Sequence, residues 1–253
     1  MNDRERLFKK LNERFVRAFA TYKLLDDGDH VLVGLSGGKD SLLLTELLAK
    51  RARINHPRFR LEAIHVRMEN IRYETSAEYL QHFCDKLGVP LHIVITSFDS
   101  TPSAQPKNTC HTPVAKEKPP CFLCSWYRRK QLFNKAQELG CNKIALGHHQ
   151  DDIIRTALMN LTFQGRFGTM PALLKMRKMP LTIIRPLCLI NEADIKRYAE
   201  YAEYEKQLKV CPYEHQTNRT AIADLFSCME RINPEARYSI WQALNAAEKL
   251  TEE

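Results

Sequence analysis

Residues 34–41 combine glycines, hydroxyls and one pair of opposite charges in the order Gly-Leu-Ser-Gly-Gly-Lys-Asp-Ser. A short apolar run precedes them and a leucine-rich run follows, so they are predicted to join a strand to a helix. At a helix N-terminus, the backbone N–H groups and the positive end of the helix dipole attract anions. Glycine lets the backbone approach a ligand closely, and Ser36 and Ser41 add hydroxyl donors. The predicted chemistry is phosphate binding.

The spacing differs from that of a Walker A loop, in which four residues separate the first glycine from a Gly-Lys-Ser/Thr ending. Here Gly34 is followed by only three residues before Gly38, and Asp40 takes the place of the serine or threonine. The alternative is an ordinary glycine turn, which six matching positions between strand and helix disfavour. The order Ser-Gly-Gly-x-Asp-Ser resembles the pyrophosphate loop of the N-type ATP pyrophosphatases. The resemblance implies ATP contacts from Ser36, Gly37, Gly38, Lys39, Asp40 and Ser41.

A second polar group, Gly147-His-His-Gln-Asp-Asp152, ends another apolar run and opens a helix. Ligands of parallel sheets bind beyond the carboxyl ends of the strands, so this group is expected to face the same nucleotide from the other side. Its carboxylates can cap the helix or hold Mg²⁺. His148 can contact phosphate or the reacting carbonyl, although a packed or surface imidazole is the alternative. The expected nucleotide contacts are Gly147, His148, Asp151 and Asp152, with Asp40 and Asp152 as candidate Mg²⁺ ligands.

Three thiols form the third candidate group. Cys121 and Cys124 make a Cys-x-x-Cys pair, and Cys211 follows at a distance, before Pro212. Three thiolates can hold three irons of a [4Fe–4S] cluster and leave the fourth iron open as a Lewis-acidic site. Zinc bound by these thiolates and one histidine is the alternative metal, and a redox-silent cysteine pair is the alternative without one.

The other cysteines and two histidines have weaker expectations. The histidine ligands of the zinc alternative are His111 or His215, and Cys110 is a candidate extra ligand. The remaining cysteines are expected to be small buried hydrophobes, and they are Cys84, Cys141, Cys188 and Cys228.

The elements that position these groups alternate between strand and helix. This pattern predicts an α/β fold with a parallel sheet, helices on both faces, and helical additions at both ends. Strands are expected at 30–34, 59–66, 91–96, 142–146 and 181–187. Helices are expected at 4–22, 39–51, 76–87, 122–139, 151–163, 192–205, 219–232 and 235–249. We expect one domain over 1–253, with an N-terminal helix in 1–25, an inserted proline-rich loop at 97–120, a loop at 165–180, and a helical part at 190–253.

The totals narrow the function classes. The chain has 253 residues, 44% hydrophobic and 27% charged, which favours a folded globular core. Its net charge of +8 favours a polyanionic partner such as nucleic acid, with a merely basic surface as the alternative. No apolar run is long enough to span a membrane, and neither a signal nor a transit peptide is recognisable, so no membrane partner is expected. We expect cytoplasmic residence, where eight cysteines indicate thiols or metal ligands rather than disulfides.

Together, these motifs resemble the tRNA-cytidine(32) 2-sulfurtransferase family of PP-loop proteins, whose core is that of the adenine nucleotide alpha hydrolases. The resemblance is carried in order by residues 36–41, Cys121–Cys124 with the following Arg-Arg, residues 143–152, Arg185-Pro-Leu187, and Cys211. It implies a [4Fe–4S] cluster on Cys121, Cys124 and Cys211, ATP with Mg²⁺, and a cysteine desulfurase as sulfur donor. It also implies that cytidine 32 of tRNA is adenylated at O2 and then receives sulfur at C2 as AMP leaves, with Asp40 and the three cysteines as catalytic residues.

Two departures from the family pattern stand out. The second Cys-x-x-Cys of the family reads Cys211-Pro-Tyr-Glu214, and a Gly-Met-Pro-Pro stretch reads Thr169-Met-Pro-Ala172. The first keeps one cysteine of its pair, which suffices for a three-thiolate cluster. The second bears on the contacts with tRNA. The candidate residues for contacts with the tRNA backbone are basic, and they are Lys116, Lys118, Arg128, Arg129, Lys130, Arg166, Lys175, Arg177 and Lys178.

Two other functions fit parts of the sequence. One is a different ATP pyrophosphatase, such as a lysidine-type ligase or an amidating enzyme, that needs no cluster. The other is a zinc-stabilised RNA-binding protein with a vestigial nucleotide site, which the complete 36–41 motif disfavours. The oligomeric state is left open, with a homodimer as one option.

Overall fold

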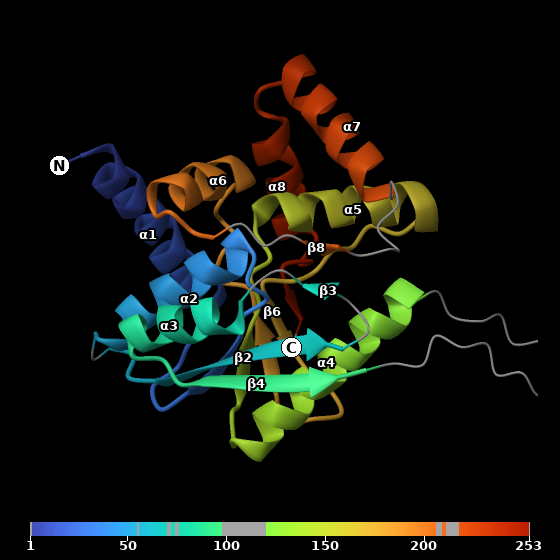
Figure 1. The fold of residues 1–253 in the computed structure, drawn as a ribbon. Coiled ribbons are helices and arrows are strands. Elements are labelled where there is room, and N and C mark those ends of the chain that lie inside the picture. The colour runs from blue at the N-terminus through green and yellow to red at the C-terminus, as the bar shows by residue number, and fades with distance from the viewer. Residues whose placement is uncertain are drawn as a thin grey trace, which may run out of the picture.

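The computed structural model describes residues 2–54, 56–69, 72–73, 76–97, 120–205, 209–210 and 218–252. Within these ranges, seven strands form one sheet between helical layers (Figure 1). The expected α/β fold is confirmed. The strands, in sheet order, are β4 (Leu91–Thr96), β2 (Arg60–Met68), β1 (His30–Gly34), β5 (Lys143–Ala145), β7 (Thr182–Ile184), β6 (Leu173–Lys175) and β9 (Thr251–Glu252).

The strand order creates a switch point beside β1. β1 pairs in parallel with β2, and β2 pairs in parallel with β4, so the chain first builds the sheet to one side. It then returns, and β5 pairs in parallel with the other edge of β1. Ligands of open α/β sheets bind in the crevice at such a point, beyond the carboxyl ends of the strands. The loops after β1 and β5 therefore lie next to each other, as their sequences predicted.

Side-chain alternation along β1 divides the core into two layers, because successive residues of a strand point to opposite faces. Val31 and Val33 belong to the larger cluster, whereas Leu32 belongs to a smaller one that Leu132 and Phe133 of α4 (Pro120–Glu138) cover. The helices α1 (Asp3–Tyr22), α2 (Lys39–Ala52) and α3 (Ala77–Leu87) supply the larger cluster. Figure 1 shows α2 and α3 on one side of the sheet and α4 on the other.

The three helices of the larger layer begin differently. α1 starts with a capping box in which Asn2 and Glu5 exchange side-chain bonds to each other's backbone N–H, and α3 is capped by the Ser76 hydroxyl. α2 starts after Gly38, which has no side chain, so no cap occupies the N–H groups of its first turn. This helix end is thus available to an anion.

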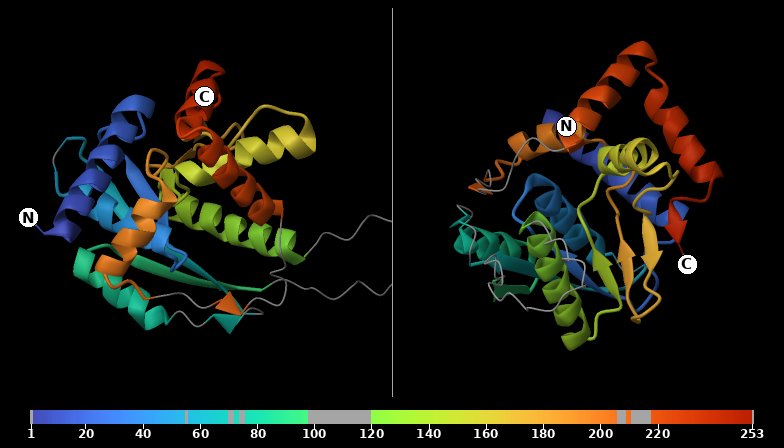
Figure 2. Two further views of the ribbon diagram at one scale, coloured as in Figure 1. Left: turned by 90° about the horizontal axis from the view of Figure 1, so that it is seen from above. Right: turned by 90° about the vertical axis from the view of Figure 1, so that its right-hand side faces the viewer.

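Four more helices complete the described part. They are α5 (Gln150–Gln164), α6 (Glu192–Tyr201), α7 (Asn218–Ile232) and α8 (Ala236–Ala246). α6 packs against α1 and α2, while α7 and α8 form a hairpin that packs against α5 (Figure 2). A separate two-stranded sheet pairs β3 (Arg72–Tyr73) with β8 (Lys209–Val210).

The structure corrects three expectations about elements. The predicted loop at 165–180 contains β6, which pairs antiparallel with β7. The helix expected to reach residue 205 ends at Tyr201, and the part expected to be helical also contributes β8 and β9. These strands are two or three residues long and owe their pairing to distant partners, so no local periodicity marks them. Most of the expected loop at 97–120 lies outside the described residues, although Pro120 already belongs to α4.

No helix in the described ranges combines the length and the apolar character needed to cross a membrane.

Candidate functional site

The loop after β1 is held by its own two serines. The Ser41 hydroxyl accepts from the Ser36 backbone N–H at 3.1 Å, lies 3.1 Å from the Ser36 hydroxyl, and donates to the Gly38 carbonyl at 2.9 Å. Gly37 has φ +87°, a left-handed conformation that favours glycine. These bonds fix a closed turn whose outer edge is the uncapped first turn of α2, as a phosphate cradle requires.

Gly147 brings the second loop against this turn. A Cβ built on Gly147 would lie 3.1 Å from the Ser41 backbone nitrogen and 3.3 Å from the Asp40 carbonyl oxygen. The neighbours are backbone atoms, so they cannot rotate out of the way. A residue without a side chain is therefore required for the loops after β1 and β5 to meet.

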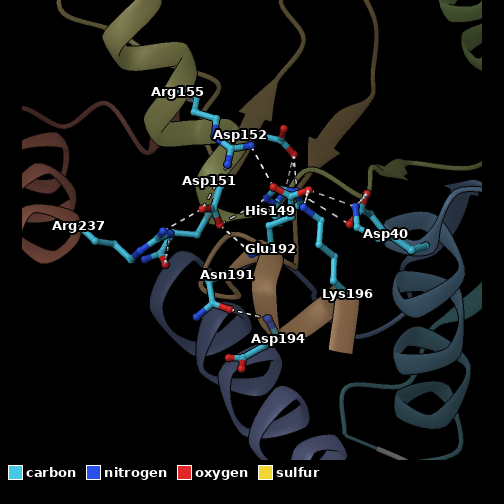
Figure 3. Close-up of polar contacts among 12 residues, drawn as sticks. Asp40, His149, Asp151, Asp152, Arg155, Asn191, Glu192, Asp194, Lys196 and Arg237 are labelled. Atoms are coloured by element: carbon cyan, nitrogen blue, oxygen red, sulfur yellow. Dashed lines mark hydrogen bonds and ion pairs between the residues drawn. The ribbon is translucent and has the colours of Figure 1, made fainter. Parts of the chain in front are cut away.

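His149 lies between two of the expected magnesium ligands (Figure 3). Its Nε2 is 3.8 Å from Asp40 Oδ1 and 3.4 Å from Asp152 Oδ2. Asp152 also accepts from the His149 backbone N–H at 3.1 Å, which caps α5. Asp40 Oδ1 is buried and has no hydrogen-bond partner among the residues whose positions are described. Two carboxylates with such an oxygen, beside a phosphate cradle, match the preference of Mg²⁺ for one or two carboxylates plus phosphate oxygens.

Asp151 makes different contacts from those of Asp152, the next residue in the chain. Its Oδ2 accepts from the Glu192 backbone N–H at 2.7 Å, and its Oδ1 accepts from Arg237 at 2.8 Å. Burial alone would raise the pKa of Asp151, but the hydrogen bond from Arg237 holds it below its ordinary value. Both oxygens thus join α5 to α6 and α8, and the expected ATP contact of Asp151 stays a prediction.

Glu192 is a site residue that the sequence did not reveal. Its carboxylate lies 3.5 Å from Lys39 Nζ, 3.0 Å from Arg155 and 3.0 Å from Lys196 (Figure 3). Burial would raise the pKa of Glu192, but Lys196, Lys39 and Arg155 lower it to about 2. Lys39 also contacts Asp40 at 3.0 Å, so two carboxylates hold this lysine beside the loop.

A cavity of about 800 Å³ opens at the carboxyl ends of β1, β2 and β5. Ser36 of the phosphate loop and His148 line it, together with apolar side chains from α4, β6 and β7. Four arginines also line it, and they are Arg128, Arg129, Arg185 and Arg219. Among the residues that the structure describes, no carboxylate lines it. The lining thus suits a ligand that combines anionic and apolar parts, such as a nucleotide.

Two buried groups in this cavity are electrostatically perturbed. Burial, reinforced by the charge of Arg185, lowers the pKa of His148 to about 4, although Asp152 acts in the opposite direction. His148 Nδ1 is buried without a hydrogen-bond partner. Burial also lowers the pKa of Arg185 to about 10, which leaves its guanidinium charged at neutral pH. At that pH the cavity therefore contains cationic arginines beside a neutral imidazole.

The thiols of the expected cluster are only partly described. Cys121 and Cys124 lie in the first turns of α4, three residues apart and so on one helical face. Cys124 is half-buried and packs against Met68, the last residue of β2. Cys211 lies outside the described residues, as do Cys110, His111, Glu214 and His215. Within the described ranges, no three His, Cys, Asp or Glu side chains converge as metal ligands.

The other cysteines agree with their expected packing in part. Burial raises the pKa of the Cys84 thiol to about 12 and that of Cys141 to about 11. Cys188 is buried as well, with its pKa raised for the same reason. These three are small core residues, whereas Cys228 is only partly buried.

Comparison with known proteins places these features in context. A family model described as "PP-loop domain" matches residues 7–220. A tRNA-cytidine(32) 2-sulfurtransferase from Bordetella avium is 34% identical over 245 residues, which covers 95% of this chain and 73% of that protein. The protein of the same name from Shewanella denitrificans is 33% identical over 248 residues, covering 94% and 71%.

A solved structure shares the fold over almost the whole chain. It is the U34-tRNA thiolase NcsA from Methanococcus maripaludis with its [4Fe-4S] cluster. The two align with a TM-score of 0.73 at 27% identity, covering 96% of this chain and 79% of that one.

Proposed function

The chain belongs to the tRNA-cytidine(32) 2-sulfurtransferase family of PP-loop proteins, and from that premise we propose how its residues carry out the reaction. It is an ATP-dependent tRNA sulfurtransferase that converts cytidine 32 to 2-thiocytidine. Activation and sulfur transfer are two chemical steps, and each draws on a separate group of residues. The two expected functions without thiolation are not favoured.

The phosphate loop binds ATP through backbone N–H groups of residues 37–41, with the Ser36 hydroxyl beside them. Lys39 is held by Asp40 and Glu192, so it contributes a positioned charge at the edge of the loop. Asp40 and Asp152 are the proposed Mg²⁺ ligands, supported by the unpartnered Oδ1 of Asp40. The charged cavity arginines neutralise the phosphates, and this positioning and charge neutralisation are the main catalytic contributions of the site.

Cytidine enters the apolar part of the cavity after leaving its stack. Its O2 attacks the α-phosphate of ATP, and pyrophosphate leaves. His148 is neutral at pH 7, so it serves as a hydrogen-bonding group rather than as a charge, through the Nδ1 that has no protein partner. Arg185 is a buried cation of this cavity, and its proposed role is to stabilise the negative charge at the transferred phosphate.

The donor set fits a thiolate-bound cluster as far as the structure describes it. Cys121 and Cys124 share one face of α4, whose charged residues between 120 and 137 are all basic. Val210 of β8 pairs with β3, the strand that follows β2, so the chain leading to Cys211 returns to the region beside Met68 and Cys124. Cys121, Cys124 and Cys211 would hold the cluster. Bound there, the cluster would supply a Lewis-acidic iron to carry the sulfur that replaces the adenylated oxygen at C2, with AMP as the leaving group.

One observation carries this proposal above the others. α4 begins with the Cys-x-x-Cys pair, and the residues of its next turns, Ser125 and Arg128, line the same cavity as Ser36 of the phosphate loop. The proposed sulfur site and the ATP site are therefore adjacent along one wall. A cysteine desulfurase as donor, a homodimer and cytoplasmic residence stay predictions.

The test is thiolation in vitro with anaerobically purified protein, ATP, Mg²⁺, sulfide and an unmodified tRNA carrying cytidine 32. Nucleoside mass spectrometry would detect 2-thiocytidine. Cys124→Ser is expected to lose iron and thiolation while ATP binding persists, whereas Asp40→Asn is expected to retain iron and lose pyrophosphate release. Cys228→Ser, a partly buried thiol on α7, is the matched control. Stoichiometric zinc, or full thiolation by iron-free protein, would overturn the cluster proposal and leave the ATP site standing.

A further inference from the structure

An exposed stripe of mixed chemistry runs along the first half of α4. It consists of Phe122, Ser125, Trp126, Arg129 and Lys130, which are spaced i, i+3, i+4, i+7 and i+8 and therefore share one helical face. Trp126 is 46% exposed and Phe122 is 49% exposed, which is unusual for such large apolar rings. We call these five residues the α4 stripe.

The α4 stripe is continuous with the cavity. Ser125 and Arg129 belong to the stripe and also line the cavity. On the adjoining face of the helix, Leu123, Cys124 and Tyr127 pack against Met68, which fixes the helix to the end of β2. The exposed rings therefore lie beside the cavity mouth, on a helix whose opposite side is anchored.

The Trp126 ring is held in position by its neighbours. Tyr127 contacts it in a T-shaped arrangement with ring centroids 5.0 Å apart, and Lys130 Nζ lies 5.4 Å from its centroid. α4 carries no acidic residue before Glu138, so the charged side chains that this helix itself contributes near the ring are all basic. Aromatic rings set among cations are the combination that binds single-stranded nucleic acid, because bases stack on the ring while the cations neutralise phosphates.

We propose that Trp126 is a stacking platform for an unpaired base of the tRNA anticodon loop, next to the nucleotide that enters the cavity. Arg129 and Lys130 contact the phosphates on either side of that base. The inference rests on the proposed function in taking tRNA as the RNA. It assigns the α4 stripe to the loop nucleotides rather than to the helical stem, since paired bases do not offer their faces for stacking.

Intrinsic fluorescence tests this contact directly, because the chain has only two tryptophans and Trp241 is buried at 6% exposure. In Trp241→Phe, the emission comes from Trp126 alone. The anaerobically purified variant, without ATP, is titrated with an anticodon stem–loop RNA and with a blunt RNA duplex of the same length and charge. Quenching by the stem–loop and not by the duplex is expected. Equal responses to both, or none to either, would refute stacking on Trp126. Should Trp241→Phe not fold, the difference between the wild-type titration and that of Trp126→Phe gives the same readout.

Affinity variants separate stacking from electrostatics and from folding. Trp126→Ala is expected to weaken stem–loop binding about 5- to 100-fold, the range for loss of one stacked base, while Trp126→Phe retains most of it. The matched control is Tyr238→Ala on α8, an aromatic residue that is 61% exposed and is not part of the cavity lining. KM for ATP should be unchanged in all three. Wild-type affinity in Trp126→Ala, or equal loss in Trp126→Phe, would overturn the proposal.

These outcomes are independent of whether the chain thiolates cytidine. Loss of thiolation in every protein, wild type included, with normal quenching by the stem–loop would count against the proposed function alone. Normal thiolation in Trp126→Ala, with unchanged KM for tRNA, would count against the α4 stripe alone.

Discussion

Gly147 is the residue on which the contact between the two loops of the site depends. Its φ is not in the left-handed region, so alanine meets no backbone strain there and the effect of substitution is steric. In Gly147→Ala, the new methyl group pushes against the backbone of Asp40 and Ser41 and displaces the first turn of α2. We expect KM for ATP to rise at least tenfold and stability to fall by about 1–3 kcal/mol, as for other overpacked sites.

Steady-state pyrophosphate release and denaturant unfolding measure these two effects. Gly168→Ala is the matched control, because a Cβ there meets only the Arg166 side chain at 3.8 Å. If Gly147→Ala binds ATP like the wild type, the loops do not need this close approach.

His148 gives stability a dependence on pH. Its pKa is about 4 in the folded protein and ordinarily 6.5, so the unfolded chain binds a proton first as the pH falls. The folded state is therefore fully favoured above pH 6.5 and loses up to about 3 kcal/mol between pH 6.5 and 4 from this residue alone. His148→Gln removes that loss. Denaturant unfolding of both proteins from pH 4 to 8, without Mg²⁺ or ATP, should show that the free energy of unfolding falls by up to about 3 kcal/mol more in the wild type than in His148→Gln between pH 6.5 and 4. Parallel curves would mean that His148 is not desolvated.

At the scale of secondary-structure elements, one carboxylate joins three helices. Asp151 at the start of α5 caps α6 through Glu192 and pairs with Arg237 of α8. Since Glu192 in turn holds Lys39, the C-terminal hairpin is connected to the phosphate loop through this contact. These contacts explain how α6 and α8 can influence the nucleotide site at the edge of the sheet.

Arg237→Ala should therefore destabilise the protein by about 1–3 kcal/mol, because the buried carboxylate of Asp151 loses the guanidinium at 2.8 Å and keeps the more distant one of Arg155 at 3.8 Å. In Asp151→Asn/Arg237→Ala, the loss should be smaller than the sum of the two single losses, since the uncompensated charge is gone. Thermal and denaturant unfolding of the four proteins of the cycle measure this coupling. Arg197→Ala on α6, whose guanidinium lies 3.3 Å from the Tyr201 hydroxyl and over the ring of that tyrosine, is the control. If the losses of stability in the two single variants add up to that of the double variant, Asp151 and Arg237 are not coupled.

The same scale shows how far the sequence could predict the fold and site. β1 and β4 agree with their predicted bounds because each is a whole apolar strand between turn residues. The adjacency of residues 36–41 and 147–152 followed from the rule that ligands sit at the carboxyl ends of parallel strands. Glu192, Arg219 and Arg237 were not given roles, because each meets its partners only after α6, α7 and α8 have packed. Asp151 and Asp152 have the same local pattern, and only the packing of α6 and α8 separates their roles.

At the scale of the whole molecule, the net charge is +8, and some of the basic residues lie where they can act on RNA. Within the described part of the chain, four arginines and no carboxylate line the cavity, and the α4 stripe extends that charge to the surface. Binding of a stem–loop RNA should thus weaken steeply with salt, because each neutralised phosphate releases a counterion.

Arg219 offers the sharpest test of this charge distribution, because it is exposed at the start of α7 and also lines the cavity. Arg219→Gln should weaken RNA binding at low salt. It should also reduce the slope of log K against log [KCl] by about 1, because one contact with a phosphate is lost. Fluorescence anisotropy of a labelled stem–loop from about 50 to 300 mM KCl measures the slope. Arg197→Gln removes the same charge from α6, away from the cavity lining, and should leave the slope unchanged. An equal change in both variants would mean that net charge, rather than the cavity arginines, governs RNA binding.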